Sequence, residues 1–144
     1  MKIFGHPLHV IFIHFPTALL PMDLVCSVLS QTLNKPSLID AAFFAMAGGV
    51  IFGWLAIVTG TFDLLKVIND KPDLLMKVLV HGGINSLVLS SYSIILFVKY
   101  KSYPDLAPDS NVLLVVKGLL VMIMFVGNFL GGRLILKYKI GVEK

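Results

Sequence analysis

The chain has 144 residues, of which 57% are hydrophobic and only 14% are charged, and its mean hydropathy is +0.90. Soluble domains carry about one quarter charged residues, so this chain lacks the polar side chains needed to cover a water-soluble globule of its size. The apolar content excludes a disordered chain, and the single cysteine excludes a disulfide framework. The composition therefore predicts an integral membrane protein.

Four apolar stretches are long enough to cross a bilayer, whose hydrocarbon core of about 30 Å needs about 20 helical residues. They cover residues 10–29, 41–62, 78–98 and 112–136. The loops between them contain Pro, Asn and charged residues and are too short to hold another domain. The sequence predicts one domain, residues 1–144, of the all-α membrane class: an up-down-up-down bundle of four transmembrane helices.

Basic residues are distributed unevenly between the two sides of such a bundle. Eight of them lie on the side that holds both termini and the second loop, whereas Lys35, Lys99 and Lys101 lie on the other side. By the positive-inside rule, both termini are predicted to be cytoplasmic. The net charge of +4 is therefore interpreted as a topology signal, and we expect a lipid bilayer and no nucleic acid as partner.

Asp23 in the first span and Lys117 in the fourth are predicted to form a structural ion pair. At about 1.5 Å per residue, Asp23 lies roughly 10 Å and Lys117 roughly 8 Å inside the outer boundary. Opposite charges at nearly one depth predict pairing, because lone charges are costly inside a membrane. A proton or ion relay stays open as the alternative role of this pair.

A second polar layer is predicted in the cytoplasmic half. It comprises His14, Asp63, His81 and Asn128, one from each predicted helix, with Asn85 one helical turn after His81. His14 and His81 lie at equal depth on two helices that face each other across a four-helix bundle. Two imidazoles so placed suit the two axial positions of one b-type haem, with the other three residues orienting or tuning the group.

Two other interpretations of the polar residues stay open. The first is a divalent-metal or proton site, because imidazole and carboxylate groups suit zinc, iron or manganese; its candidates are His6, His9, His14, His81 and Asp63. The second is a non-catalytic assembly or scaffold protein whose polar groups are satisfied within the bundle. Motifs of soluble-type catalysis such as HExxH or GxSxG do not occur, so no independent enzymatic activity is predicted.

Two GxxxG pairs, Gly49 with Gly53 and Gly127 with Gly131, lie in the second and fourth spans. Small residues four apart let helix backbones approach closely, which is the commoner role of such pairs in membranes. A groove for a flat cofactor such as a porphyrin is the functional alternative. The packing acts either within the chain or between the copies of a homo-oligomer.

The chain resembles a family of uncharacterised small prokaryotic membrane proteins, domain of unknown function 2231. That family opens HPxHPxxxHFPxAL, and residues 6–19 here read HPLHVIFIHFPTAL, with Val10 where the family has its second proline. Weaker similarities occur at residues 60–65, 81–85 and 131–134, so the resemblance extends along almost the whole chain.

The resemblance implies four spans, a motif of three histidines and a location in the prokaryotic inner membrane as a multi-pass protein. Relatives with this domain are sometimes fused to Rieske-type iron–sulfur or cytochrome-like modules. By analogy, the resemblance implies membrane electron transfer with a redox partner protein.

Overall fold

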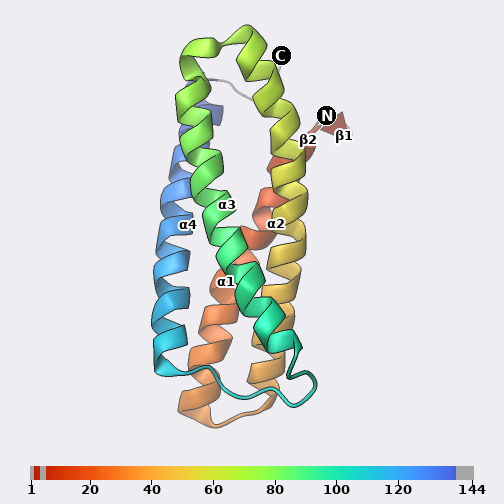
Figure 1. Ribbon diagram of the computed structural model, residues 1–144, viewed down its shortest axis with the longest axis vertical. Coiled ribbons are helices and arrows are strands. Elements are labelled where there is room, and N and C mark those ends of the chain that lie inside the picture. The colour runs from red at the N-terminus through yellow and green to blue at the C-terminus, as the bar shows by residue number, and fades with distance from the viewer. Residues whose placement is uncertain (1, 4–5, 139–144) are drawn as a thin grey trace.

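The computed structural model describes residues 2–3 and 6–138, and of residues 2–3 and 6–7 it describes the backbone alone. Four long helices, α1 (Leu8–Leu33), α2 (Ser37–Asp70), α3 (Leu75–Tyr100) and α4 (Asn111–Tyr138), run alternately along one axis (Figure 1). All four are long and apolar enough to cross a membrane. The predicted four-helix membrane bundle is confirmed, and α1 begins at the end of the bundle where α4 finishes (Figure 1).

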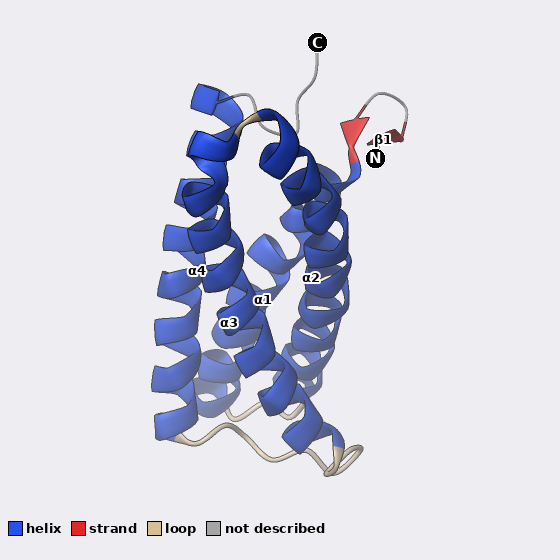
Figure 2. Ribbon diagram, turned by 45° about the horizontal axis from the view of Figure 1, so that its top comes forward, coloured by secondary structure: helices blue, strands red, loops and turns tan. Residues whose placement is uncertain are grey.

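Each helix packs on its neighbour in sequence, and α4 also packs on α1, which closes the bundle (Figure 2). The contact between α1 and α2 is the most extensive of these interfaces. α1 and α3 therefore run in the same direction on one diagonal of the bundle, and α2 and α4 occupy the other. This arrangement lets side chains from α1 and α3 meet across the centre.

Local sequence explains where the helices begin and end. α1 ends at Leu33 because Asn34 adopts a left-handed conformation, with a φ of 51°, and Pro36 then opens α2. Pro72 opens the short 3-10 helix η1 (Pro72–Leu74), which leads directly into α3. The helices extend beyond the predicted apolar spans because backbone hydrogen bonding continues into the polar ends until such a signal occurs.

A short antiparallel pair precedes α1 and was not predicted from the sequence. Its strands are β1 (Lys2–Ile3) and β2 (His6–Pro7), in a register that places Ile3 opposite His6. The pair ends where α1 begins at Leu8, two residues earlier than the predicted span. His9 therefore lies in the first turn of α1, just before the predicted apolar span.

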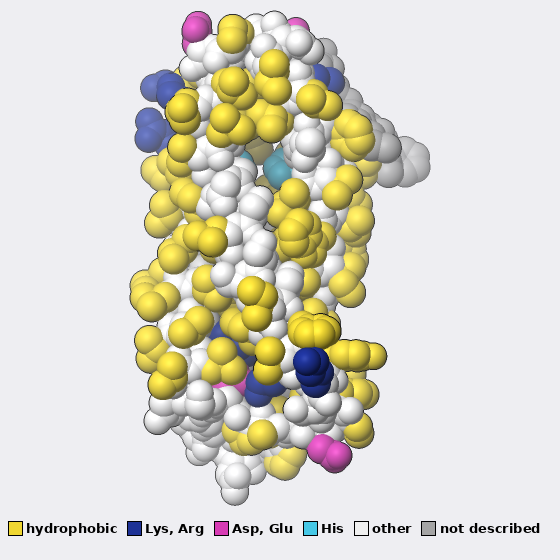
Figure 3. All heavy atoms as spheres, viewed as in Figure 1, with side chains coloured by type: hydrophobic (Ala, Val, Ile, Leu, Met, Phe, Trp, Pro, Cys, Tyr) yellow, Lys and Arg dark blue, Asp and Glu magenta, His cyan; other side chains and the backbone are white. Residues whose placement is uncertain are grey.

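The core is centred on the middle of the bundle, where Leu20, Met46, Val88 and Tyr92 are almost completely buried. Many other large apolar side chains point outward, and in Figure 3 they cover the flank of the bundle, as expected for a lipid-facing surface. The GxxxG pair in α2 packs within the chain: a Cβ atom on Gly49 would lie 2.6 Å from Leu20 Cδ2.

Candidate functional site

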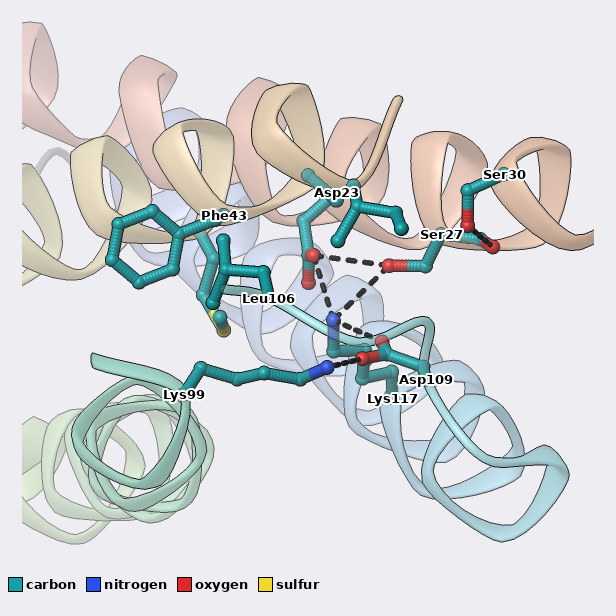
Figure 4. A pocket seen from close by; sticks show the side chains of 11 residues that line it. Asp23, Ser27, Ser30, Phe43, Lys99, Leu106, Asp109 and Lys117 are labelled. Carbon is teal, nitrogen blue, oxygen red and sulfur yellow. Dashed lines mark hydrogen bonds and ion pairs between the residues drawn. The ribbon is translucent and has the colours of Figure 1, made fainter. Parts of the chain in front are cut away.

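Four charged residues meet at the end of the bundle away from the termini; we call Asp23, Lys99, Asp109 and Lys117 the ion-pair cluster (Figure 4). Lys117 Nζ lies 2.7 Å from Asp23 Oδ1 and 2.6 Å from Asp109 Oδ2. Lys99 Nζ lies 2.6 Å from Asp109 Oδ1. The structure thus brings Asp23 and Lys117 together, with their side chains 0% and 1% exposed.

The sequence did not predict that Asp109 and Lys99 join this cluster, because Asp109 lies in the loop before α4 and Lys99 at the end of α3. The loop before α4 turns back over the bundle end, and Gln31 of α1 donates a hydrogen bond to the Asp109 carbonyl. Lys99 also donates to the Ala107 carbonyl, at 2.8 Å. Burial alone would raise the pKa of Asp109, but hydrogen bonds from Lys117 and Lys99 and their positive charges outweigh it and hold that pKa below its ordinary value.

The ion-pair cluster has equal numbers of positive and negative side chains, so its net charge is zero. The space between these side chains measures about 10 Å³, the room for about one water molecule. Ser27 accepts a hydrogen bond from Lys117 at 3.2 Å and donates one to Asp23 at 3.4 Å. These features favour a packed joint that holds α1, α3 and α4 together over a binding site for a ligand.

A cavity of about 800 Å³ lies between the four helices at the other end of the bundle, toward the termini; we call it the histidine cavity. Figure 3 shows a hollow on this part of the surface, with imidazole atoms visible inside it. Most of the lining is apolar or glycine. Its polar side chains include His9, His14, Thr17, Asp63, His81, Asn85 and Asn128. All five residues of the predicted haem layer therefore line one cavity, together with His9.

The three histidines of the cavity share one hydrogen-bonding pattern. The Nδ1 atom of His9 lies 2.8 Å from the Ala56 carbonyl, that of His14 lies 2.6 Å from the Val10 carbonyl, and that of His81 lies 2.8 Å from the Gly127 carbonyl. A carbonyl oxygen only accepts, so the proton of the neutral ring resides on Nδ1. Each Nε2 atom then carries the lone pair of the neutral ring, which is the state a metal-ligating histidine needs.

Amide side chains from α3 and α4 support this end of the bundle. Asn85 donates to the His81 carbonyl at 3.0 Å, and its Nδ2 atom lies 3.2 Å from His81 Nδ1. Asn128 donates to Thr17 Oγ1 at 3.1 Å, which joins α4 to α1 beside the cavity. Both amides therefore have structural partners next to the histidines.

The predicted metal cluster does not form among the side chains that the structure describes. No group of three or more His, Cys, Asp or Glu residues there lies close enough to hold a metal ion. His9 and His14 lie on different faces of α1, and His14 is exposed, with its ring bonded to its own helix. Asp63 lines the cavity without completing such a group, and the side chain of His6 lies outside the described residues.

No curated protein and no solved structure matches this chain. One family model, described as a predicted membrane protein, DUF2231, matches residues 5–144. The match includes the ion-pair cluster and the histidine cavity as well as all four helices. The resemblance inferred from the opening motif is thereby confirmed. The chain belongs to the DUF2231 family of predicted membrane proteins.

Proposed function

We propose that the protein binds one b-type haem in the histidine cavity and acts as a membrane electron-transfer subunit. The observation that carries this proposal is the set of imidazoles in an apolar cavity of about 800 Å³, each with Nδ1 bound to a backbone carbonyl. This volume is within the range of cofactor sites, about 300–1,000 Å³. His81 of α3 and an imidazole of α1, which the sequence predicts to be His14, would hold the haem iron.

The physical fit rests on orientation and polarity. A histidine whose Nδ1 donates to a carbonyl is held in the tautomer and ring orientation that present Nε2 to iron. The apolar lining excludes water and gives a hydrophobic porphyrin a favourable environment. Arg133 follows the cavity-lining Gly132 and would supply positive charge at this end of the bundle to offset the haem propionates. A carboxylate at Asp63 is then placed to tune the reduction potential.

The test is an absorption spectrum of the detergent-purified protein from cells supplied with a haem precursor. The oxidised protein should show a Soret band, and dithionite should produce a sharp α band. His81→Ala should remove the six-coordinate spectrum, whereas Ser91→Ala, at a half-buried position of the same helix outside the cavity lining, should keep it. A flat visible spectrum with no extractable haem would overturn the proposal. Elemental analysis of that sample would then distinguish a metal site from a scaffold protein.

A further inference from the structure

We infer that the histidine cavity is built from two equivalent helical hairpins, α1–α2 and α3–α4, and that His9 and His81 are the equivalent pair that ligates the haem iron. The inference rests on the proposed function and refines it, because it names His9 in place of His14 as the ligand from α1.

Each of these two histidines is held by the partner helix of its own hairpin. His9 of α1 bonds through Nδ1 to the Ala56 carbonyl of α2, and His81 of α3 bonds through Nδ1 to the Gly127 carbonyl of α4, both at 2.8 Å. The two sequence separations, 47 and 46 residues, are nearly the same. The same interaction thus occurs at the same place in both hairpins.

The two hairpins also share a glycine that lies one helical turn after the residue with the accepting carbonyl. A Cβ atom on Gly60 would lie 2.9 Å from His9 Nδ1, and one on Gly131 would lie 2.5 Å from His81 Cε1. Both distances are too short for a real Cβ contact, so each ring lies directly on the backbone of the neighbouring helix. The absence of a side chain at Gly60 and Gly131 therefore sets the position of each imidazole.

The arrangement of the helices relates the two hairpins by an approximate half-turn about the bundle axis. α1 and α3 run in the same direction on one diagonal, and α2 and α4 on the other (Figures 1 and 2). Such a rotation brings the His9 ring and the His81 ring toward a common axis from opposite sides. Both rings line the cavity. Two axial ligands of one iron require this opposed placement.

His14 lacks these features. It is exposed, and its Nδ1 atom bonds to the Val10 carbonyl of its own helix instead of to α2. It follows His9 by five residues, which places it on a different face of α1. His14 lies at a depth that suits a ligand, but its position around the axis of α1 does not place its ring opposite His81.

The test compares three single variants of the haem-loaded full chain: His9→Ala, His14→Ala and His81→Ala. We expect His9→Ala and His81→Ala each to convert a low-spin, six-coordinate spectrum into a high-spin one, and added imidazole to restore it. His14→Ala should keep the low-spin spectrum. Loss of the low-spin spectrum in His14→Ala, with retention in His9→Ala, would overturn the assignment of His9 while leaving haem binding intact.

A second set of variants tests the repeat without removing a ligand. Gly60→Ala and Gly131→Ala should each displace one ring and increase the high-spin fraction several-fold. Gly118→Ala on α4 is the matched control, because a Cβ atom there would meet nothing within 4 Å. Unchanged low-spin spectra in both Gly60→Ala and Gly131→Ala would contradict the inferred seating of the rings. Absence of haem from the wild-type protein itself would overturn the proposed function, and this inference with it.

Discussion

Replacing Lys117 by methionine should be among the most destabilising single changes in the bundle. It removes the cation from Asp23, whose side chain is 0% exposed, while Asp109 keeps Lys99 at 2.6 Å. Among the described residues, Asp23 Oδ2 has no hydrogen-bond partner, so the buried carboxylate is stabilised through the contacts of its Oδ1 atom. Breaking one partner out of a buried pair costs about 3–5 kcal/mol, and we expect a loss of unfolding free energy in that range.

The companion variant combines Lys117→Met with Asp23→Leu, which removes both buried charges and replaces them by apolar side chains. Replacing a buried pair by apolar residues is often neutral or stabilising, so the double variant should recover most of the lost stability. Unfolding in mixed micelles can be followed by the fluorescence of Trp54, the single tryptophan, which donates a hydrogen bond to Ser93 and so reports on the α2–α3 contact. Equal destabilisation by the single and double variants would refute the argument from unpaired charge.

Three further predictions concern other residues. The folded state lowers the pKa of Asp109, so its ion pairs stabilise the fold fully at pH values above the ordinary pKa of 3.8. This contribution is lost as the pH falls through the lower pKa of the folded state. When the free energy of unfolding is measured from pH 7 downward, Asp109→Asn should lack this pH-dependent loss. Asp63→Asn should raise the midpoint potential of the proposed haem by roughly 30–60 mV, since it removes negative charge that would favour the oxidised iron. An unchanged potential in redox titration would place Asp63 outside the proposed site. Gly49→Ala should lower the free energy of unfolding by about 1–3 kcal/mol, because the new Cβ atom overpacks against Leu20. Gly118→Ala should be neutral or raise it by up to about 1 kcal/mol. Chemical unfolding in which Gly118→Ala is the more destabilising variant would contradict this packing.

Hydropathy and helix geometry suffice to predict the bundle and much of its polar interior. The four helices, the diagonal placement of α1 and α3 and the proximity of Asp23 to Lys117 all follow from span length and from depth counted along a helix. Depth is recoverable from sequence because the bilayer gives every span the same two boundaries. Residues of opposite charge at the same depth can then be matched between spans without knowing the loops.

The depth of a residue along its helix did not predict two features of the structure, the place of Asp109 in the ion-pair cluster and that of His9 in the cavity. Asp109 joins the ion-pair cluster because its loop turns back over the end of the bundle, and a polar loop of this length carries no pattern that fixes such a path. His9 enters the cavity because α1 begins at Leu8, whereas the apolar span begins at Val10. The rotation of His9 relative to His14 also depends on which face of α1 meets α2, which is a property of packing.

The two ends of the bundle differ in how much space lies between the helices, and this difference bears on function. At the ion-pair cluster, Lys117 and Asp109 fill the space between the helices almost completely and leave room for about one water molecule. At the other end, the same four helices enclose about 800 Å³. A ligand that fills apolar volume gains dispersion contacts, so a ligand bound in this cavity would stabilise the bundle. The ion-pair cluster joins the helices at one end, and at the other end imidazoles whose Nδ1 atoms bind backbone carbonyls line the cavity.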